Sequence, residues 1–344
     1  MFPLLPEGHN GSIVVCGIVS RRRFGHLYLG VKFERKNECR RNITMAKPFL
    51  KWVGGKTQLL DNVLGLFPSE MNNYHEPFLG GGSVLLGFLT EVREGKKTLH
   101  GTVYASDVNP ILIALYKHIQ GNVEGFIAEL QQLDTEFSNL KGTLVNRKPT
   151  SVEDAKTSQE SYYYWIRAQF NALPDKTTRK ASAMMLFLNK TCFRGVYREG
   201  PHGFNVPFGH YKNPTIVDEV NLRAVSALIQ PVVFRCQGFE QSFQAFQAED
   251  FTYLDPPYAP ETDTSFDTYV ADGFSKESHI KLFTLCQGLR AKKIGMTLSN
   301  ANVPFVTNAF PEPPFQLYLV SARRAINSKD PSATTDEILI TNEE

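Results

Sequence analysis

The residues best suited to chemistry are Asp255, Pro256, Pro257 and Tyr258, which directly follow the apolar run 251–254. A short β-favouring run that stops at an acid and two prolines predicts a buried strand with a rigid, polar tip. The Asp255 carboxylate and the Pro256 carbonyl can accept hydrogen bonds from an amine conjugated to a planar ring, and Tyr258 offers a face for stacking. By itself the quartet is also consistent with a strand followed by a proline-rich turn.

Two glycine turns precede this quartet and suit a small ligand. In 52–56, paired glycines lie between Trp52 and Lys56, which offer a stacking surface and a charge for a carboxylate. This first turn could also be no more than a loop that caps a helix. In 76–84, an expected strand end passes through Gly80 and its two neighbouring glycines into an expected helix. Such a turn admits a nucleotide-like cofactor at the carboxyl end of a strand.

An acid at the end of the next expected strand, 103–107, strengthens this interpretation. Asp107 lies about 25 residues beyond the glycines, a spacing that suits hydrogen bonds to ribose hydroxyls. The glycines do not follow the GxGxxG pattern, so a pyrophosphate is not implied. An adenosine without phosphate, such as S-adenosylmethionine, fits better.

A basic segment at 189–212 indicates contact with nucleic acid. Two β-like pieces, 195–198 and 204–208, flank a Gly-Pro-His-Gly turn and predict a hairpin. Arginine on a β-ribbon can reach guanine edges, while Lys and Tyr can hold phosphates. A solvated charged hairpin is the alternative, but it leaves the many aromatic and glycine positions unexplained. The segment has one acid, Glu199, and these basic residues: Lys190, Arg194, Arg198, His202, His210 and Lys212.

The apolar pattern predicts the scaffold that must position these motifs. Residues 110–190 read as packed helices with aromatic residues in the core, and helices and strands alternate after Asp218. Among the later elements we expect a helix at 241–247 and a strand at 294–298 with Ser299 and Asn300 at its tip. The polar segment 260–274 is expected to be a lid.

Length and composition describe a globular protein of about two domains. Of the 344 residues, 42% are hydrophobic and 21% are charged, and no apolar stretch is long enough to span a bilayer. Residues 1–44 hold eight Lys/Arg against three Asp/Glu, which leaves 29 against 32 in the remainder. Any contact with nucleic acid must therefore come from a local basic patch.

The cysteines and the first 44 residues add two further expectations. The five cysteines are widely spaced without a CxxC pair, which favours a reducing compartment and argues against a zinc site. Residues 1–44 look unlike the rest and are predicted to be disordered, or to precede the natural start at Met45. A transit peptide is conceivable, but serine is scarce and no secretory h-region is present.

Together the motifs resemble the Dam-type DNA adenine-N6 methyltransferases, the alpha group of the D12 class. The resemblance covers nearly all of 47–341 and depends on FLKWVGGK, EPFLGGGSV, SDVN, FNVPFGHYKNP and DPPY, in that order. It implies an α/β fold: a Rossmann-like, S-adenosylmethionine-dependent methyltransferase sheet with an inserted, mostly helical target-recognition domain that carries a β-hairpin. The implied division is 45–110 with 215–344 for catalysis and 111–214 for recognition, with 1–44 as an extension.

The resemblance also implies roles for individual residues. The target adenine would lie at Asp255, Pro256, Pro257 and Tyr258, with no metal involved. The cofactor pocket would be lined by Trp52, Lys56, Phe78, Gly80, Asp107, Phe239 and Asp255. DNA would be contacted by Lys51, Arg194, Val196, Arg198, Pro207 and Tyr211.

These roles predict methyl transfer from S-adenosylmethionine to N6 of a flipped adenine in duplex DNA, within GATC. The sequence departs from the family pattern in two ways, since the hairpin turn is one residue shorter and Arg194 replaces an amide. A recognition sequence other than GATC therefore stays open. We expect a cytoplasmic monomer without membrane contact, with more than one copy able to act on DNA. The alternatives are a methyltransferase for RNA, cytosine N4 or protein glutamine, and a catalytically silent DNA-binding regulator.

Overall fold

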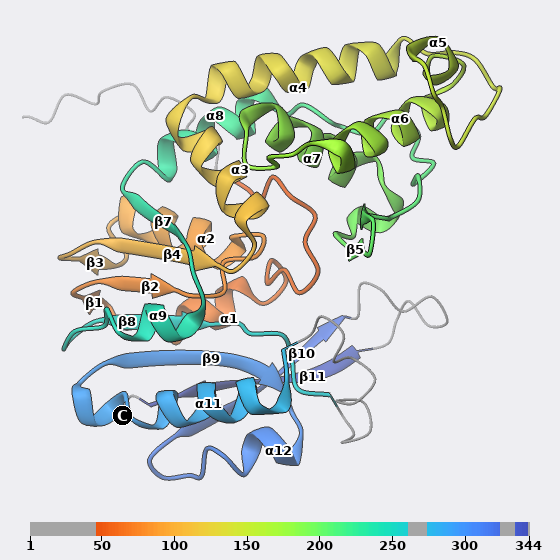
Figure 1. Ribbon diagram of the computed structural model, residues 1–344. Helices are drawn as coiled ribbons and strands as arrows, with labels where there is room; N and C mark the ends of the chain where they lie inside the picture. The colour runs from red at the N-terminus through yellow and green to blue at the C-terminus, as the bar shows by residue number, and fades with distance from the viewer. Residues whose placement is uncertain (1–45, 261–273, 324–333, 343–344) are drawn as a thin grey trace, which may run out of the picture. The chain divides into compact units, whose positions relative to one another are not determined.

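The computed structural model describes residues 46–260, 274–323 and 334–342, and their centre is a seven-stranded sheet (Figure 1). The strand order is β10-β11-β9-β8-β2-β4-β7. The bounds are β2 (Tyr74–Glu76), β4 (Val103–Asp107), β7 (Val232–Cys236), β8 (Phe251–Leu254), β9 (Gly295–Ala301), β10 (Gln316–Arg323) and β11 (Thr334–Thr341). Strands β7, β4, β2, β8 and β9 are parallel, whereas β11 is antiparallel to both of its neighbours. The carboxyl ends of the five parallel strands therefore share one edge of the sheet.

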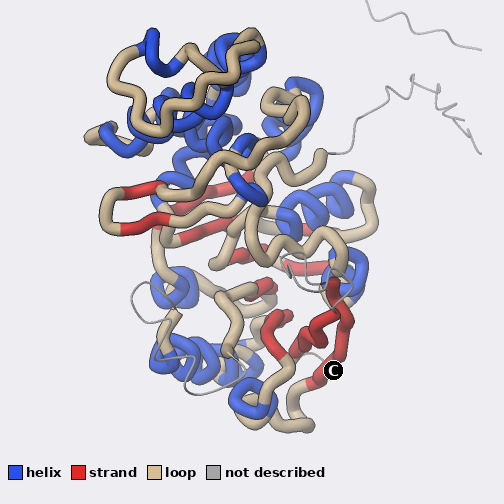
Figure 2. Tube along the Cα trace, turned by 90° about the vertical axis from the view of Figure 1, so that its right-hand side faces the viewer, coloured by secondary structure: helices blue, strands red, loops and turns tan. Residues whose placement is uncertain are grey.

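Most of the helices between β4 and β7 lie together at one end of the described chain, as the two views show (Figure 1, Figure 2). These are α3 (Pro110–Gly121), α4 (Val123–Ser138), α5 (Val152–Ala155), α6 (Gln159–Ala172), α7 (Arg179–Thr191) and α8 (Glu219–Leu228). The other helices are α1 (Leu60–Gly65), α2 (Ser83–Arg93), α9 (Phe239–Phe243), α11 (Lys276–Gln287) and α12 (Pro304–Thr307). Two small sheets pair β1 (Glu70–Met71) with β3 (Thr98–Leu99), and β5 (Glu199–Gly200) with β6 (Gly203–Phe204).

Side-chain caps decide where several helices begin. Asn109 accepts hydrogen bonds from the N–H groups of Ile111 and Leu112, and Pro110 occupies the first position of α3. A capping side chain of this kind contributes about 1 kcal/mol. Asn122, Ser151, Ser158, Thr178, Asp218 and Ser275 cap α4, α5, α6, α7, α8 and α11 in the same way.

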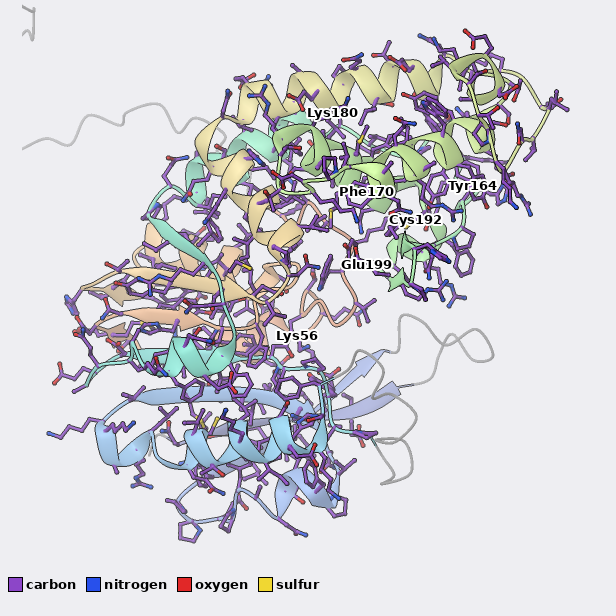
Figure 3. All side chains as sticks on the ribbon, in the orientation of Figure 1. Lys56, Tyr164, Phe170, Lys180, Cys192 and Glu199 are labelled. Atoms are coloured by element: carbon purple, nitrogen blue, oxygen red, sulfur yellow. The ribbon has the colours of Figure 1, made fainter. Side chains whose placement is uncertain are left out.

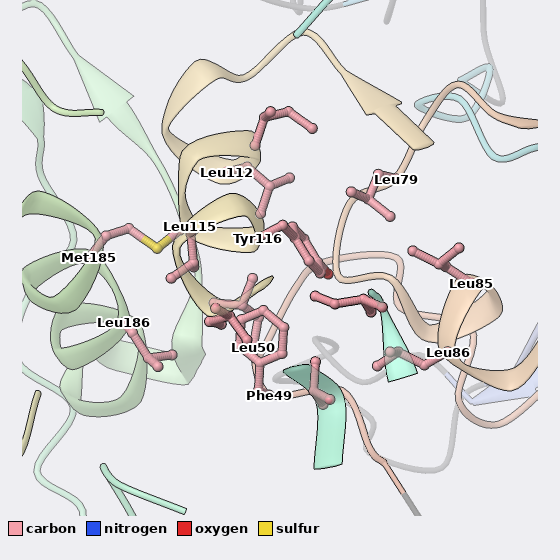
Figure 4. Close-up of a cluster of buried hydrophobic side chains, with 14 of the residues drawn as sticks. Phe49, Leu50, Leu79, Leu85, Leu86, Leu112, Leu115, Tyr116, Met185 and Leu186 are labelled. Carbon is pink, nitrogen blue, oxygen red and sulfur yellow. The ribbon is translucent and has the colours of Figure 1, made fainter. Parts of the chain in front are cut away.

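The apolar residues before the first glycine turn anchor that turn in the core. Phe49 and Leu50 are buried among side chains of α2, α3 and α7 (Figure 4). The Phe49 ring packs edge-on against Tyr116 of α3, with ring centroids 5.1 Å apart. Burial of side chains of this size contributes roughly 1.5–3 kcal/mol each. This packing therefore fixes the backbone position of Lys51 and Trp52, which follow directly.

Three local predictions are wrong in their boundaries. The hairpin strands are only two residues each, and 193–195 form a 3-10 turn in which Arg194 has φ 57°. Strand β9 runs on to Ala301, because β11 pairs with it and draws Ser299 and Asn300 into the sheet. Helix α9 starts and ends earlier than the predicted 241–247.

Other predicted elements are confirmed. Strand β8 has the predicted limits, and 110–191 is mainly helical, with a buried face of aromatic residues on α6. The extension 1–44 lies outside the described residues, as does nearly all of the expected lid.

Candidate active site

The site lies at the carboxyl edge of the sheet, where the chain segments that follow two neighbouring strands run in opposite directions. Strand β2 has β4 on one side and β8 on the other, so the chain after β2 and the chain after β8 diverge at this edge. Ligands of open α/β sheets bind at such a switch point, outside the carboxyl ends of the strands. The three acids that end strands here are Glu76, Asp107 and, directly after β8, Asp255.

Asp107 is held by the second glycine turn. The Gly80 N–H donates to one Asp107 carboxylate oxygen at 3.0 Å, and the Asn109 N–H donates to the other at 2.9 Å. Burial raises the pKa of Asp107 above its usual value, and these backbone donors oppose that rise. Each oxygen keeps a second lone pair, so the half-buried carboxylate can accept hydrogen bonds from a diol.

An apolar residue missed by the sequence reasoning adjoins Asp107. Val108 is 72% exposed, although it lies between two polar residues that are tied to the turn. An exposed valine at the carboxyl end of a parallel strand offers an apolar contact to a planar ring. The sequence signal would have been an apolar residue directly after the acid that ends a strand.

Trp52 and Tyr116 explain why the second turn consists of glycines. A Cβ at Gly81 would lie 2.9 Å from the Trp52 Cβ, and one at Gly82 would overlap the Tyr116 hydroxyl. Gly82 also has φ +65°, which disfavours other residues. The Trp52 ring stacks on Tyr197, with centroids 5.6 Å apart and an interplanar angle of 23°. Trp52 thus contacts both the second glycine turn and the basic segment.

The first glycine turn brings Lys56 to the catalytic quartet. Lys56 is 4% exposed, and its ammonium lies 2.9 Å from Asp255 Oδ2. The Lys56 backbone N–H donates to Ser83 Oγ at 3.0 Å, and its ammonium donates to the Gly54 carbonyl at 2.8 Å. Lys56 was predicted to face a cofactor carboxylate, whereas its partner here is Asp255. Figure 3 labels Lys56 below Cys192 and Glu199 of the basic segment.

The Lys56 ammonium and burial shift the pKa of Asp255 in opposite directions. Burial raises the pKa of Asp255 above its usual value, while Lys56 lowers it and the Glu337 charge adds a small rise. Burial has the larger effect on the pKa of Asp255, because the hydration free energy that a buried carboxylate loses exceeds the attraction that one ammonium supplies. The 18% exposure of the Asp255 side chain leaves it accessible to a ligand.

Tyr258 is fixed at both ends. The Tyr258 hydroxyl donates to Glu337 Oε2 at 2.7 Å, and the Lys56 ammonium lies 4.9 Å from the centroid of its ring. The next residue, Ala259, donates its N–H to Asn300 Oδ1 at 3.0 Å. Pro256 is buried and Pro257 is exposed. The sequence reasoning missed Glu337, because no local motif marks this acid of β11.

Glu76 is a buried acid at the end of β2. It accepts a hydrogen bond from the Tyr74 hydroxyl at 2.7 Å. Burial, with a smaller contribution from the Asp255 charge, raises the pKa of Glu76 to about 8. Glu76 is therefore mainly protonated at neutral pH, which limits the negative charge next to Asp255.

Two predicted cofactor residues are aromatic and lie together. The rings of Phe78 and Phe239 stack with centroids 5.7 Å apart and an interplanar angle of 26°. Phe78 follows β2 and Phe239 opens α9. Two stacked rings provide an apolar wall at the same edge of the sheet as Asp107.

The predicted DNA contacts gather around Lys51. Asn189 of α7 accepts the Lys51 N–H at 3.0 Å and donates to the carbonyls of Lys51 at 2.8 Å and Gly195 at 3.0 Å. The Lys51 ammonium lies 4.1 Å from the centroid of the Tyr211 ring. Asn189 therefore ties the FLKW stretch to the basic segment.

The remaining predicted DNA contacts lie on the surface of the basic segment. Arg194, Arg198 and Pro207 are exposed, and Val196 is half-exposed. The Arg198 Nε–H donates to Asn205 Oδ1 at 2.7 Å. The Arg194 guanidinium lies 5.2 Å from the centroid of the Phe193 ring, and Phe193 is 48% exposed.

A polar cavity at the opposite ends of the strands is not part of this site. It measures about 430 Å³ and borders Asp250, Phe251 and Gly295 at the starts of β8 and β9. Asp250 accepts hydrogen bonds from side-chain and backbone donors, including both amide groups of Asn73. Its carboxylate therefore stabilises the fold.

A comparison with known protein families identifies the chain. The family model for D12 class N6 adenine-specific DNA methyltransferases matches residues 52–326. The chain belongs to this family. The predicted family and the α/β methyltransferase fold are confirmed, and the D12 class protein is an adenine-specific DNA methyltransferase.

Named relatives agree with this assignment. The Type II methyltransferase M.MjaIII of Methanocaldococcus jannaschii is 38% identical over 292 residues, which cover 82% of this chain and 93% of that protein. The DNA adenine methylase of Haemophilus influenzae is 32% identical over 267 residues, which cover 77% of this chain and 82% of that protein. The DNA adenine methylase of Escherichia coli K12 is 28% identical over 284 residues.

Two other kinds of feature, a membrane-spanning helix and a metal-binding cluster, have no candidate among the described residues. Among the helices of residues 46–260, 274–323 and 334–342, none is long and apolar enough to cross a membrane. The same ranges hold no cluster of three His, Cys, Asp or Glu side chains suited to a metal ion.

Proposed function

We propose that this D12 class methyltransferase transfers a methyl group from S-adenosylmethionine to N6 of an adenine that has been flipped out of duplex DNA. The observation that carries the proposal is the arrangement at the tip of β8. Asp255 and Tyr258 lie beside one buried ammonium, at the same sheet edge as Asp107. A hydrogen-bond acceptor for an amine and a ring for stacking thus lie at the same sheet edge as a hydrogen-bond acceptor for ribose hydroxyls.

The residues around Asp107 fit the cofactor. A half-buried carboxylate with open lone pairs suits a ribose diol, and exposed Val108 with the Phe78–Phe239 pair suits an adenine ring. The pocket would be completed by Trp52, Lys56 and Gly80. Lys56 and Asp255 would both lie close to the methionine end of the cofactor, with Lys56 near its carboxylate. When bound, S-adenosylmethionine supplies an electrophilic methyl group.

The chain's own residues orient the nucleophile. Asp255 and the carbonyl of Pro256 accept hydrogen bonds from the N6 hydrogens, which localises the nitrogen lone pair. Tyr258 stacks on the base, whose amine cannot be reached while it lies inside the helix. Pro257 stiffens the loop between them. Alignment of this kind can contribute roughly 7 kcal/mol or more to lowering the barrier.

The basic segment would read the DNA. Bases would be contacted by Lys51, Val196, Arg198 and Pro207, and the backbone by Tyr211. Arg194 would also contact the DNA. We propose GATC as the site, because Lys51, Arg198 and Pro207 stand at the positions that the family resemblance assigns to contacts with GATC bases. The recognition part would be 111–214 and the catalytic part 45–110 with 215–344, in a monomer of which more than one copy can act on DNA.

The proposal is tested by nucleoside mass spectrometry of plasmid DNA treated with the enzyme and S-adenosylmethionine. We expect N6-methyladenine in the unaltered enzyme's product, and resistance of the plasmid to a nuclease that GATC methylation blocks. Asp255→Ala should abolish transfer and leave the circular dichroism spectrum unchanged. Asp175→Ala, on an exposed loop, is the matched control and should keep full activity.

The same assay separates the alternatives. N4-methylcytosine would indicate a cytosine N4 enzyme, and transfer confined to RNA or protein would reject DNA as the substrate. Near-normal transfer by Asp255→Ala would show that Asp255 does not hold the amine. Loss of S-adenosylmethionine binding in calorimetry would favour a silent DNA-binding regulator.

A further inference from the structure

The hydrogen bond between Tyr258 and Glu337 joins the catalytic loop to a strand that does not adjoin β8. Glu337 lies on β11, opposite Ala301 of β9 and Val320 of β10. Strand β9 separates β11 from β8, and the two bonded residues are 79 positions apart in the chain. The 2.7 Å contact therefore connects two elements that have no shared backbone ladder.

This bond restricts the Tyr258 ring. A tyrosine side chain has two torsions about which the ring can turn, and a hydrogen bond from its hydroxyl selects among them. With its Cα held by the loop and its hydroxyl held by Glu337, the ring keeps one plane. The Lys56 ammonium is 4.9 Å from the ring centroid, and Ala259 is held by Asn300.

The local charges favour Tyr258 as the donor. Burial raises the pKa of Tyr258 well above 10, and the charges of Asp255 and Glu337 raise it further. The phenol therefore keeps its proton, and the carboxylate of Glu337 accepts it in a hydrogen bond. A charge-assisted bond of this kind is stronger than one between neutral groups.

We propose that Glu337 is a positioning residue for catalysis: it holds the Tyr258 ring in the plane that stacks on the extrahelical adenine. This inference rests on the proposed function, because it assigns the use of a ring that stacks on the flipped base. Because the orientation of the Tyr258 ring is already fixed, its side chain loses no rotational freedom when the base binds. Glu337 itself does not touch the reacting atoms.

The test combines single and double variants of the full-length enzyme. Glu337→Ala should lower kcat for methyl transfer to a GATC duplex roughly tenfold, the effect of one lost charge-assisted hydrogen bond. The fluorescence of 2-aminopurine at the target position, which rises when the base leaves the stack, should fall in parallel. S-adenosylmethionine affinity measured by calorimetry should stay unchanged.

Two further variants identify the hydrogen bond as the cause. Glu337→Gln keeps an acceptor oxygen and should restore kcat to within about threefold of the unaltered enzyme. Tyr258→Phe should lose as much as Glu337→Ala, and the double variant should lose no more than either one. Asp336→Ala is the matched control, since Asp336 neighbours Glu337 on β11 but accepts from exposed Ser321.

Several outcomes would overturn the inference. It is wrong if Glu337→Ala keeps full kcat, if the two losses add in the double variant, or if Glu337→Gln is as impaired as Glu337→Ala. If Glu337→Ala fails to fold, full kcat and full 2-aminopurine signal in Tyr258→Phe would still reject it. Absence of transfer to DNA by the unaltered enzyme would instead reject the proposed function, and the inference with it.

Discussion

At the scale of single residues, the Lys56–Asp255 pair predicts how activity depends on pH. Asp255 accepts hydrogen bonds from an amine most strongly while it is ionised, and burial already raises its pKa. Lys56→Met removes the ammonium 2.9 Å away, so the pKa of Asp255 should rise further. We expect the low-pH limb of methyl transfer to move to higher pH, as measured from pH profiles at saturating S-adenosylmethionine.

The control for this experiment is Lys96→Met, which removes an exposed ammonium paired with Glu94. Its pH profile should match that of the unaltered enzyme. An unchanged low-pH limb in Lys56→Met would show that Lys56 does not set the ionisation of Asp255.

Glu76 makes a second residue-scale prediction, for stability. Its pKa is about 8 in the folded protein, against an ordinary value of 4.5, so the folded state binds more protons between these values. Stability should therefore fall as pH rises from about 5 to 8, by at most about 1.4 kcal/mol per pH unit from this group. Glu76→Gln should flatten that decline in urea unfolding, and an identical pH dependence in both proteins would contradict the assigned pKa.

At the scale of elements, the Trp52–Tyr197 stack joins the glycine turns to the basic segment. Tyr197→Ala removes a ring that also packs on Phe204 of β6 at 5.6 Å. An aromatic pair contributes roughly 0.5–1.5 kcal/mol beyond its buried area. We expect a GATC duplex to bind several-fold more weakly, by fluorescence anisotropy.

Tyr197→Phe separates stacking from hydrogen bonding in this experiment. It keeps the ring and loses only the hydroxyl that donates to exposed Glu199 at 2.7 Å. Its DNA affinity should therefore stay close to that of the unaltered enzyme. Equal weakening in Tyr197→Phe and Tyr197→Ala would assign the effect to the hydroxyl and reject the stack as the link.

At the scale of the whole molecule, the family match begins at residue 52, after the basic extension. The described residues start at 46 and place Phe49 and Leu50 in the core. A shortened chain that begins at Met45 should therefore keep methyl-transfer activity close to that of the full chain. A large loss, measured in parallel assays on the same duplex, would show that residues 1–44 contribute to the enzyme.

The sequence by itself determined the local features of this methyltransferase. An apolar run that stops at Asp255 forms a buried strand, and three glycines between strand and helix form a turn at the sheet edge. These features depend on neighbouring residues alone, through side-chain size and backbone freedom. The order of such motifs along the chain was enough to predict the family.

Only the tertiary structure decided which distant side chains meet. Glu337 reaches Tyr258 because β11 inserts between β9 and β10, and Asn189 joins Lys51 to Gly195 because α7 ends beside the FLKW stretch. The hairpin strands are short for the same reason, since the 3-10 turn at 193–195 interrupts the pairing of the two arms and Asn189 binds the Gly195 carbonyl. Strand order and side-chain direction set these contacts, and no local pattern in the sequence encodes either one.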